Sequence, residues 1–341
     1  MRIGRAGVPT IRDVARLAGV SVGTVSRVIN AKASVARDVR SDVEKAIAAL
    51  GYHPNPLAQG MRGRATRTVG CIIRDIAIAG LARFVRAAHD RLAEAGYALI
   101  LSNSEGRIER ERALVGVMAA RRADALIIAQ SAEDDPAMEA SLKAAGIPVV
   151  VFDRVRPDWA DAVLIDHRAG MRQATERLIA LGHRRIGLMT GSLSLHPARE
   201  RVAGYVAAHD AAGVARDPAL VRAGSFHPDF GFAQTMGLLA SAAPPSAIIA
   251  GGIDMLPGVI RAIRARGLSI PGDLSLIAAG ASDLAELLQP PVSVELWDYA
   301  EVGRAVAELA LERIGGTAAA GPRRIVVPAT LEVRGSCAPP R

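Results

Sequence analysis

The chain has 341 residues, half of them hydrophobic, so it is long enough to form more than one domain with a sizeable core. Its net charge of +8 lies in residues 1–67, which contain 12 Lys and Arg against 4 acidic residues, whereas residues 68–341 contain 30 of each kind. This confinement excludes a uniformly basic protein and is typical of a polyanion-binding module joined to a neutral body.

Nothing in the sequence indicates a secreted or membrane-spanning protein. The longest uncharged run, residues 230–253, is interrupted by Pro244-Pro245 and reads as a helix, a turn and a strand. The first nine residues carry arginines, but no apolar segment follows them, so no signal peptide is evident. Cys71 and Cys337 have no metal-ligand spacing, and we expect free thiols in a reducing cytoplasm.

Two short helices joined by a tight turn are predicted in Thr10–Asn30. Thr10 and Asp13 have the spacing of a capping box, Gly19 permits the left-handed turn that ends the first helix, and Ser21 caps the second helix. Three residues form the inward face of the second helix: Val25, Val28 and Ile29. A helix–turn–helix of this size places its second helix in the DNA major groove, although an ordinary helical hairpin would show the same pattern.

The segment closely resembles the N-terminal signature of the lactose-repressor (LacI/GalR) family of bacterial transcription regulators. The likeness continues through Tyr52-His53-Pro54-Asn55 and along nearly the whole chain. It implies an all-α helix–turn–helix domain in residues 1–52, a hinge in residues 53–67, and an α/β domain like a periplasmic binding protein, with two parallel-sheet subdomains, in residues 68–341. The resemblance further implies a homodimer that represses transcription from a near-palindromic, double-stranded operator.

The DNA-binding residues are predicted from the second helix and from the family pattern. Val22, Gly23 and Arg27 face outward toward base edges, although Arg27 could instead only neutralise a phosphate. Thr24, Ser26 and Asn30, with the start of each helix, suit phosphate contacts. A third helix, Arg37–Leu50, ends at Gly51, and Val35 and Tyr52 complete a small core. The full set of expected DNA contacts is Thr10, Ser21, Val22, Gly23, Thr24, Ser26, Arg27, Asn30, Asn55, Ala58 and Met61.

The linker, residues 54–66, corresponds to the family's hinge helix, which forms on operator DNA. The resemblance places Met61 at the position that wedges into a base step and Ala58 at the close contact between paired hinge helices. Pro56 and Gly60 depart from the pattern, and Gly60 costs roughly 1 kcal/mol relative to Ala in a helix. We therefore expect a hinge helix that forms reluctantly and only with DNA, with a plain flexible linker as the alternative.

From Thr68 the sequence alternates between apolar strands and helices. The expected strands are Val69–Ile73, Ala98–Leu101, Ala125–Ala129, Val149–Phe152, Ile186–Met189, Leu220–Ala223, Ala247–Ala250, Ser275–Ala278 and Val294–Glu295, with Ile325–Val327 and Leu331–Val333 finishing the sheet. The expected helices are Leu81–Ala95, Ile108–Arg121, one ending at Gly146, Gly170–Gly182, Arg199–Ala212, Phe230–Ala242, Leu256–Arg266 and Ala300–Ile314. The pattern predicts two parallel-sheet subdomains, the second beginning near residues 160–166, with a ligand cleft between them. Residues 336–341 are expected to be a frayed tail.

For a small-molecule effector, the resemblance carries over to residues at strand ends: Arg74, Gln130, Phe152, Asp153, Arg199, Phe226, Asp254, Trp297 and Tyr299. Arg199 is expected to clamp an oxygen-rich group. Acids and amides of sugar-responsive members are replaced here by Gly252-Ile253 and Gly280-Ala281. The expected effector is therefore a sugar acid, a sugar phosphate or a less polar molecule in place of a neutral sugar, and a cleft that binds nothing tightly is the alternative.

No catalytic constellation is found in the sequence. The seven histidines lack metal-type spacing, no nucleophile elbow or Walker loop occurs, and Asp166-His167 reads as a simple strand-end pair. We expect no enzyme activity, no cofactor, no metal and no membrane partner, and a cytoplasmic, nucleoid-associated protein. The alternative class is a solute-binding transport protein of the same α/β architecture, which would need export.

Overall fold

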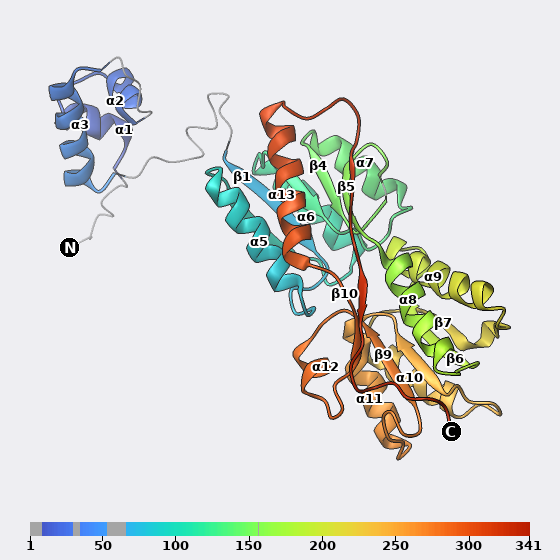
Figure 1. The fold of residues 1–341 in the computed structure, drawn as a ribbon. Coiled ribbons are helices and arrows are strands. Elements are labelled where there is room, and N and C mark those ends of the chain that lie inside the picture. Colours follow the sequence, from blue (N-terminus) through green and yellow to red (C-terminus); the bar gives the residue numbers. More distant parts are fainter. Residues whose placement is uncertain (1–8, 30–34, 53–65, 156) are drawn as a thin grey trace, which may run out of the picture. The chain divides into compact units, whose positions relative to one another are not determined.

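The computed structural model describes residues 9–29, 35–52, 66–155 and 157–341. The chain divides into two compact units, Met1–Thr66 and Arg67–Arg341 (Figure 1). The first unit contains α1 (Ile11–Leu17), α2 (Val22–Ile29) and α3 (Arg37–Leu50). Each of these three helices was expected from the sequence, and each is confirmed.

Local hydrogen bonds explain where the first two helices begin. The backbone N–H of Thr10 donates to the Asp13 carboxylate at 2.9 Å, and the backbone N–H of Thr24 donates to Ser21 Oγ at 3.1 Å. Gly19, with a φ of 66°, makes the left-handed turn between the helices. The three helices pack around a small hydrophobic core, against which Val35 and Tyr52 also pack. Its buried members are Val14, Ala15, Val25, Val28, Val43 and Ala46.

The second unit holds two six-stranded sheets, one in each subdomain. The first sheet has the order β11-β5-β4-β3-β1-β2 and is entirely parallel. The second has the order β12-β10-β9-β8-β6-β7 and is parallel except for the pairing of β10 with β12. The strands are β1 (Thr68–Ile73), β2 (Ala98–Asn103), β3 (Ala125–Ile128), β4 (Val149–Phe152), β5 (Asp161–Ile165), β6 (Ile186–Gly191), β7 (Val221–Gly224), β8 (Ala247–Ala250), β9 (Ser275–Ala279), β10 (Ser293–Leu296), β11 (Arg324–Val327) and β12 (Thr330–Glu332).

Helices cover both faces of each sheet, which is why the central strands are buried on both sides (Figure 1). In the first subdomain, α5 and α13 pack on one face and α6 and α7 on the other. In the second subdomain, α8 and α9 cover one face and α10 and α11 the other. The helices are α5 (Leu81–Glu94), α6 (Ile108–Ala120), α7 (Pro136–Ala145), α8 (His167–Ala180), α9 (His196–Ala212), α10 (Pro228–Leu239), α11 (Leu256–Ala265), α12 (Asp283–Leu287) and α13 (Tyr299–Gly315), with short 3-10 turns η1 (Pro218–Leu220) and η2 (Ile253–Met255). None of the described helices combines the length and the apolar character that a bilayer crossing requires.

The chain passes between the subdomains three times: from β5 to α8, from β10 to α13, and from β11 to β12. The prediction for the last two strands is wrong, and β5 was not predicted as a strand. The last two strands do not finish one sheet, because β11 pairs with β5 in the first sheet and β12 pairs with β10 in the second. The short helix α12 was not predicted, because it spans only 5 residues.

The C-terminal segment is not frayed. Ser336 is fully buried, its hydroxyl accepts the backbone N–H of Ser293 at 2.8 Å, and the backbone N–H of Ala338 donates to Ser275 Oγ at 3.0 Å. Arg341 forms an ion pair with Asp273 at 3.0 Å. The tail packs because two strand-borne serines supply polar partners for it, and such partners lie far away in the sequence.

Candidate functional site: a cavity between two subdomains

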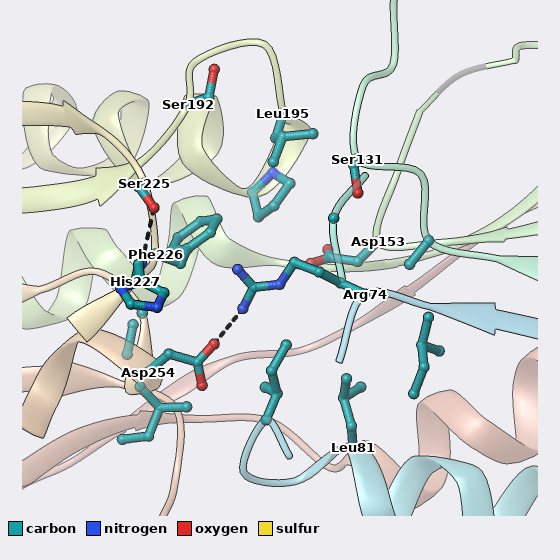
Figure 2. A pocket seen from close by; sticks show the side chains of 18 of the residues that line it. Arg74, Leu81, Ser131, Asp153, Ser192, Leu195, Ser225, Phe226, His227 and Asp254 are labelled. Atoms are coloured by element: carbon teal, nitrogen blue, oxygen red, sulfur yellow. Dashed lines mark hydrogen bonds and ion pairs between the residues drawn. The ribbon is translucent and has the colours of Figure 1, made fainter. Parts of the chain in front are cut away.

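A cavity of about 440 Å³ lies between the two subdomains, at the carboxyl ends of their strands. Arg74 directly follows β1 in the first subdomain, and Phe226 and Asp254 follow strands β7 and β8 in the second. In Figure 2 the Arg74 side chain extends across the cavity, with Phe226 beside it and Asp254 at its tip. Seven of the nine predicted effector residues line this cavity: Arg74, Phe152, Asp153, Phe226, Asp254, Trp297 and Tyr299.

The structure does not place the other two at the cavity. Gln130 is buried, and its backbone carbonyl accepts a hydrogen bond from Arg154 Nε at 2.6 Å. Arg199 turns away: one guanidinium nitrogen donates to the carbonyl of Leu193 at 3.1 Å and the other to Glu133 at 3.4 Å. Arg201, two residues further along α9, lines the cavity in its place. Residues two apart on a helix point in nearly opposite directions, so only one of the two arginines can face the cleft.

Arg201 is held in a buried cluster of four ionisable side chains at the junction of the subdomains. His167 Nε2 lies 3.0 Å from Asp153 Oδ2, and His167 Nδ1 lies 3.4 Å from Glu295 Oε1. Arg201 Nε lies 3.8 Å from Glu295 Oε2, and its guanidinium faces the rings of Phe226 and Trp297. Two carboxylates and one guanidinium are balanced in charge only when the histidine is protonated.

The pKa values of this cluster agree with a charged histidine. Burial and the Arg201 charge by themselves lower the pKa of His167, but Asp153 and Glu295 raise it above its ordinary value. Burial by itself raises the pKa of Asp153, but the His167 charge and hydrogen bond, with Arg154 and Arg201, bring it below its ordinary value. Apart from the pair Asp166-His167, no sequence pattern predicted this cluster. Asp166 has a separate role there, since its side chain caps α8 by accepting the backbone N–H of Ala169 at 3.0 Å.

Aromatic side chains occupy the space that the missing acids and amides leave. A Cβ atom on Gly252 would stand 2.5 Å from a Phe226 ring carbon, and one on Gly191 would stand 2.2 Å from another. A Cβ atom on Gly280 would stand 3.1 Å from Ile253 Cβ and 3.5 Å from a ring carbon of Trp297. The glycines at positions 191 and 252 are therefore required by the ring of Phe226, and this part of the cavity wall is apolar.

The polar contacts across the cavity come from charged residues. Arg74 Nη2 donates to Asp254 Oδ2, an ion pair between the first and the second subdomain. Burial raises the pKa of Asp254, and the Arg74 charge offsets this only in part. Among the described residues, no group of three or more His, Cys, Asp or Glu side chains is arranged to hold a metal ion.

The helix–turn–helix unit presents most of its predicted DNA contacts at the surface. Thr10, Ser21, Gly23 and Arg27 are exposed, whereas Val22, Thr24 and Ser26 are half-buried. Arg27 Nε donates to the carbonyl of Gly23 at 3.3 Å, which lays the guanidinium along the outer face of α2. The remaining predicted contacts, Asn30, Asn55, Ala58 and Met61, and the hinge residues Pro56 and Gly60 lie outside the described residues.

A helix–turn–helix unit followed by a two-subdomain α/β unit with a cleft is the architecture of a ligand-responsive, DNA-binding transcription regulator. Residues 10–55 match the model for bacterial regulatory proteins of the lacI family, and residues 175–337 match a periplasmic binding protein-like domain. The chain is 36% identical over 336 residues to the HTH-type transcriptional regulator CelR of Thermobifida fusca, covering 96% of this chain and 98% of the relative. It belongs to the lacI family.

Other comparisons agree with this assignment. The HTH-type transcriptional repressor PurR of Escherichia coli is 31% identical over 307 residues, covering 89% of this chain and 90% of the relative. A lac repressor dimer bound to operator and the anti-inducer ONPF matches with a TM-score of 0.85 and 28% identity, over 97% of this chain and 100% of that one. A CelR–cellobiose complex matches with a TM-score of 0.72 and 34% identity, over 96% and 99%. These relatives are transcription regulators, which supports that function over a transport protein of the same architecture.

Proposed function

We propose that this regulator represses transcription as a homodimer on a near-palindromic operator and that a small molecule in the cavity controls its affinity for DNA. The observation that carries this proposal is that both subdomains line the same 440 Å³ cavity. A ligand there contacts both subdomains at once, so it favours one of their relative orientations over others. Control of this kind is a coupling between two sites and is therefore reciprocal: the operator also changes the affinity for the effector.

On the DNA side, the domain of residues 1–52 supplies the readout. Arg27 bonds a guanine edge and Val22 touches a thymine methyl group, while Thr10, Ser21, Thr24, Ser26 and Asn30 contact phosphates around them. Gly23 offers no side chain, so direct readout at its position is weak. Asn55, Ala58 and Met61 act in the hinge of residues 53–67, where Met61 wedges into a base step.

On the effector side, we propose a sugar or a sugar-derived anion bound within residues 68–341. Phe226, Trp297 and Tyr299 stack on or wall in the ligand, and Asp153 accepts hydrogen bonds from its hydroxyls. Arg74 and Arg201 favour a carboxylate or phosphate on that ligand, because guanidinium groups bind such oxygens in two-pronged fashion. Arg201 thus takes the place that the sequence assigned to Arg199.

The protein works as a regulator in the cytoplasm, with the nucleoid, and without catalysis.

Matched ligands test the effector class directly. Because the relative CelR has been solved with cellobiose, the panel pairs cellobiose with cellobionate, glucose with glucuronate, and glucose with glucose 6-phosphate. We expect the acid of a pair to raise the melting temperature of the full chain more than its neutral partner. A ligand at a hundred times its dissociation constant adds about 2.7 kcal/mol to the folded state. Tight binding of the neutral partners alone would contradict the anionic effector.

The operator is found by selecting duplexes from a random DNA pool with the full chain. We expect enriched duplexes to share a near-palindrome, and the hit from the ligand panel to change operator affinity in fluorescence anisotropy. Selection of a site without two-fold symmetry would contradict the homodimer, and a hit that leaves operator affinity unchanged would contradict effector control.

A further inference from the structure

Besides the His167–Asp153 contact of the buried cluster and the three passages of the chain, two further ionic contacts join the subdomains across the cleft. The first is the ion pair of Arg74 with Asp254, whose side chains are 32% and 21% exposed. Arg74 directly follows β1 in the first subdomain, and Asp254 lies in η2 of the second. Figure 2 shows this contact reaching across the middle of the cavity.

The second contact is centred on Glu133, which lies between β3 and α7 in the first subdomain and whose side chain is fully buried. One carboxylate oxygen accepts the backbone N–H of His196, the first residue of α9 in the second subdomain. The other accepts Arg199 Nη2 at 3.4 Å and the backbone N–H of Val155 at 3.1 Å. A carboxylate at the start of a 17-residue helix is also favoured by the helix dipole.

The two contacts hold the cleft at different places. Ser131 and Leu195, which are close in sequence to Glu133 and His196, line the cavity on the opposite side of the Arg74 side chain from Asp254 in Figure 2. The carboxylates of both contacts are largely or wholly shielded from water, where an unpaired charge is costly. Separation of the subdomains would leave Glu133 without two of its three partners and Asp254 without its guanidinium.

We propose that Arg74–Asp254 and Glu133 with His196 and Arg199 form a clasp that holds the two subdomains in the closed arrangement by protein contacts alone. The clasp gives the cleft a closed state whose population depends on two specific carboxylates. An effector that binds between Arg74 and Asp254 breaks this ion pair. Its own contacts with the two subdomains then take the place of that half of the clasp. This last step rests on the proposed effector function, whereas the clasp itself does not.

Hydrogen exchange of the full chain, followed by mass spectrometry of its peptides, tests the clasp without any ligand. The variants are Glu133→Gln and Asp254→Asn, each of which replaces a carboxylate oxygen with a donor at nearly constant size. The matched control is Glu200→Gln, since Glu200 lies on the same helix α9 but pairs with Arg168 inside the second subdomain at 2.8 Å. We expect about tenfold faster exchange in peptides covering residues 129–135 and 192–199 for both variants, because opening exposes these cleft segments. Exchange in β3 and β8 should stay as in the wild type.

Two results would overturn the clasp. One is exchange in the cleft peptides no faster than in Glu200→Gln, which would mean that the contacts do not hold the subdomains together. The other is faster exchange throughout, including β3 and β8, which would mean that the carboxylates only stabilise the fold. If Glu133→Gln fails to fold, Asp254→Asn decides alone, since its side chain is partly exposed. A failure of effector control would appear separately, as operator affinity that no ligand changes, and would leave the exchange result standing.

Discussion

The protonation of His167 depends on the side chains that surround it in the fold. It is completely buried where β5 passes into α8, and it contacts Asp153 from the first subdomain and Glu295 from the second. Its protonated form completes a cluster of two positive and two negative groups. Because the neighbouring carboxylates raise its pKa above the ordinary value of 6.5, the folded state keeps the His167 proton to a higher pH than the unfolded chain does.

This linkage predicts a pH-dependent effect of His167→Gln on the free energy of unfolding. The stabilisation from protonated His167 is fully present below pH 6.5 and is lost as the pH rises through the higher pKa of the folded state. We expect the variant to be less stable than the wild type at pH 6 and the difference to narrow toward pH 9, in urea unfolding measured along the series. His89→Gln is the control, because His89 is exposed. A difference that stays constant over this range would contradict a protonated, buried His167.

At the scale of elements, close approach between helices depends on single glycines. The helices α8 and α9 pack tightly on the second sheet, and a Cβ atom on Gly204 of α9 would stand 2.3 Å from the carbonyl oxygen of Arg168 in α8. Gly237 in α10 is different, since a Cβ atom there meets nothing within 4 Å. Packing therefore requires glycine at position 204 and does not require it at position 237.

Substitution by alanine should change the free energy of unfolding in opposite directions at these two glycines. Gly204→Ala should lower the free energy of unfolding by about 1–3 kcal/mol, because backbone atoms of α8 must move away. Gly237→Ala should raise it by about 0.5–1 kcal/mol, because alanine favours the helix and has room. Urea unfolding monitored by circular dichroism measures both. Destabilisation of similar size in both variants would contradict the assignment of tight packing to Gly204 and of free space to Gly237.

The C-terminal segment also acts as a structural element. The Ser336 hydroxyl accepts the backbone N–H of Ser293 in β10 and donates to the carbonyl of Leu276 in β9, at 2.8 and 2.5 Å. It thereby fixes the end of the chain to two strands of the second sheet.

We expect Ser336→Ala to lower the free energy of unfolding by about 1–3 kcal/mol, because it leaves buried backbone groups unpaired. Ser241→Ala, at an exposed serine, is the matched control and should stay within about 0.5 kcal/mol of the wild type. Both are measured in urea unfolding. Equal and small effects would mean that the tail contributes no stability.

At the scale of the whole molecule, charge and hydrophobic burial are divided between different parts of the chain. All of the net charge lies in residues 1–67, whereas residues 68–341 have equal numbers of acidic and basic residues, and some of their ion pairs join the two subdomains at the cleft. Three chain passages connect the subdomains, so their relative orientation can change without disrupting either sheet. DNA attraction and ligand response therefore reside in separate units.

This division predicts strongly salt-dependent DNA binding with little change in stability. If each DNA-binding event neutralises six to ten phosphates, raising salt from about 50 to 200 mM should weaken binding about 10³–10⁵-fold. Fluorescence anisotropy with duplex DNA measures this dependence, and thermal unfolding in the same buffers serves as the control, with its midpoint nearly constant. DNA affinity that hardly changes with salt would contradict the assignment of residues 1–67 as the polyanion-binding module.

Local sequence patterns were sufficient to predict most helices and strands and the class of protein. Capping residues, helical periodicity and apolar strands are local signals, so α1, α2, α3 and the alternating strands and helices, except β5 and α12, could be predicted close to their bounds. The confinement of charge to residues 1–67 required no structure at all. The place of the cavity was predictable because the carboxyl ends of parallel strands meet at one edge of a sheet, whereas its residues, such as Arg74, Asp153 and Phe226, were predicted from the family resemblance.

Which side chains contact each other depends on how the helices and strands pack in three dimensions. Arg199 and Arg201 are both near the start of α9, and the rotation of that helix against the sheet turns Arg201 to the cavity and Arg199 to Glu133. The burial of His167, the packing of Ser336 and the division of β11 and β12 between two sheets likewise depend on residues far away in the sequence. Local sequence patterns do not predict such distant contacts. A buried charge or hydrogen-bonding group is stabilised by the partner that the fold places beside it.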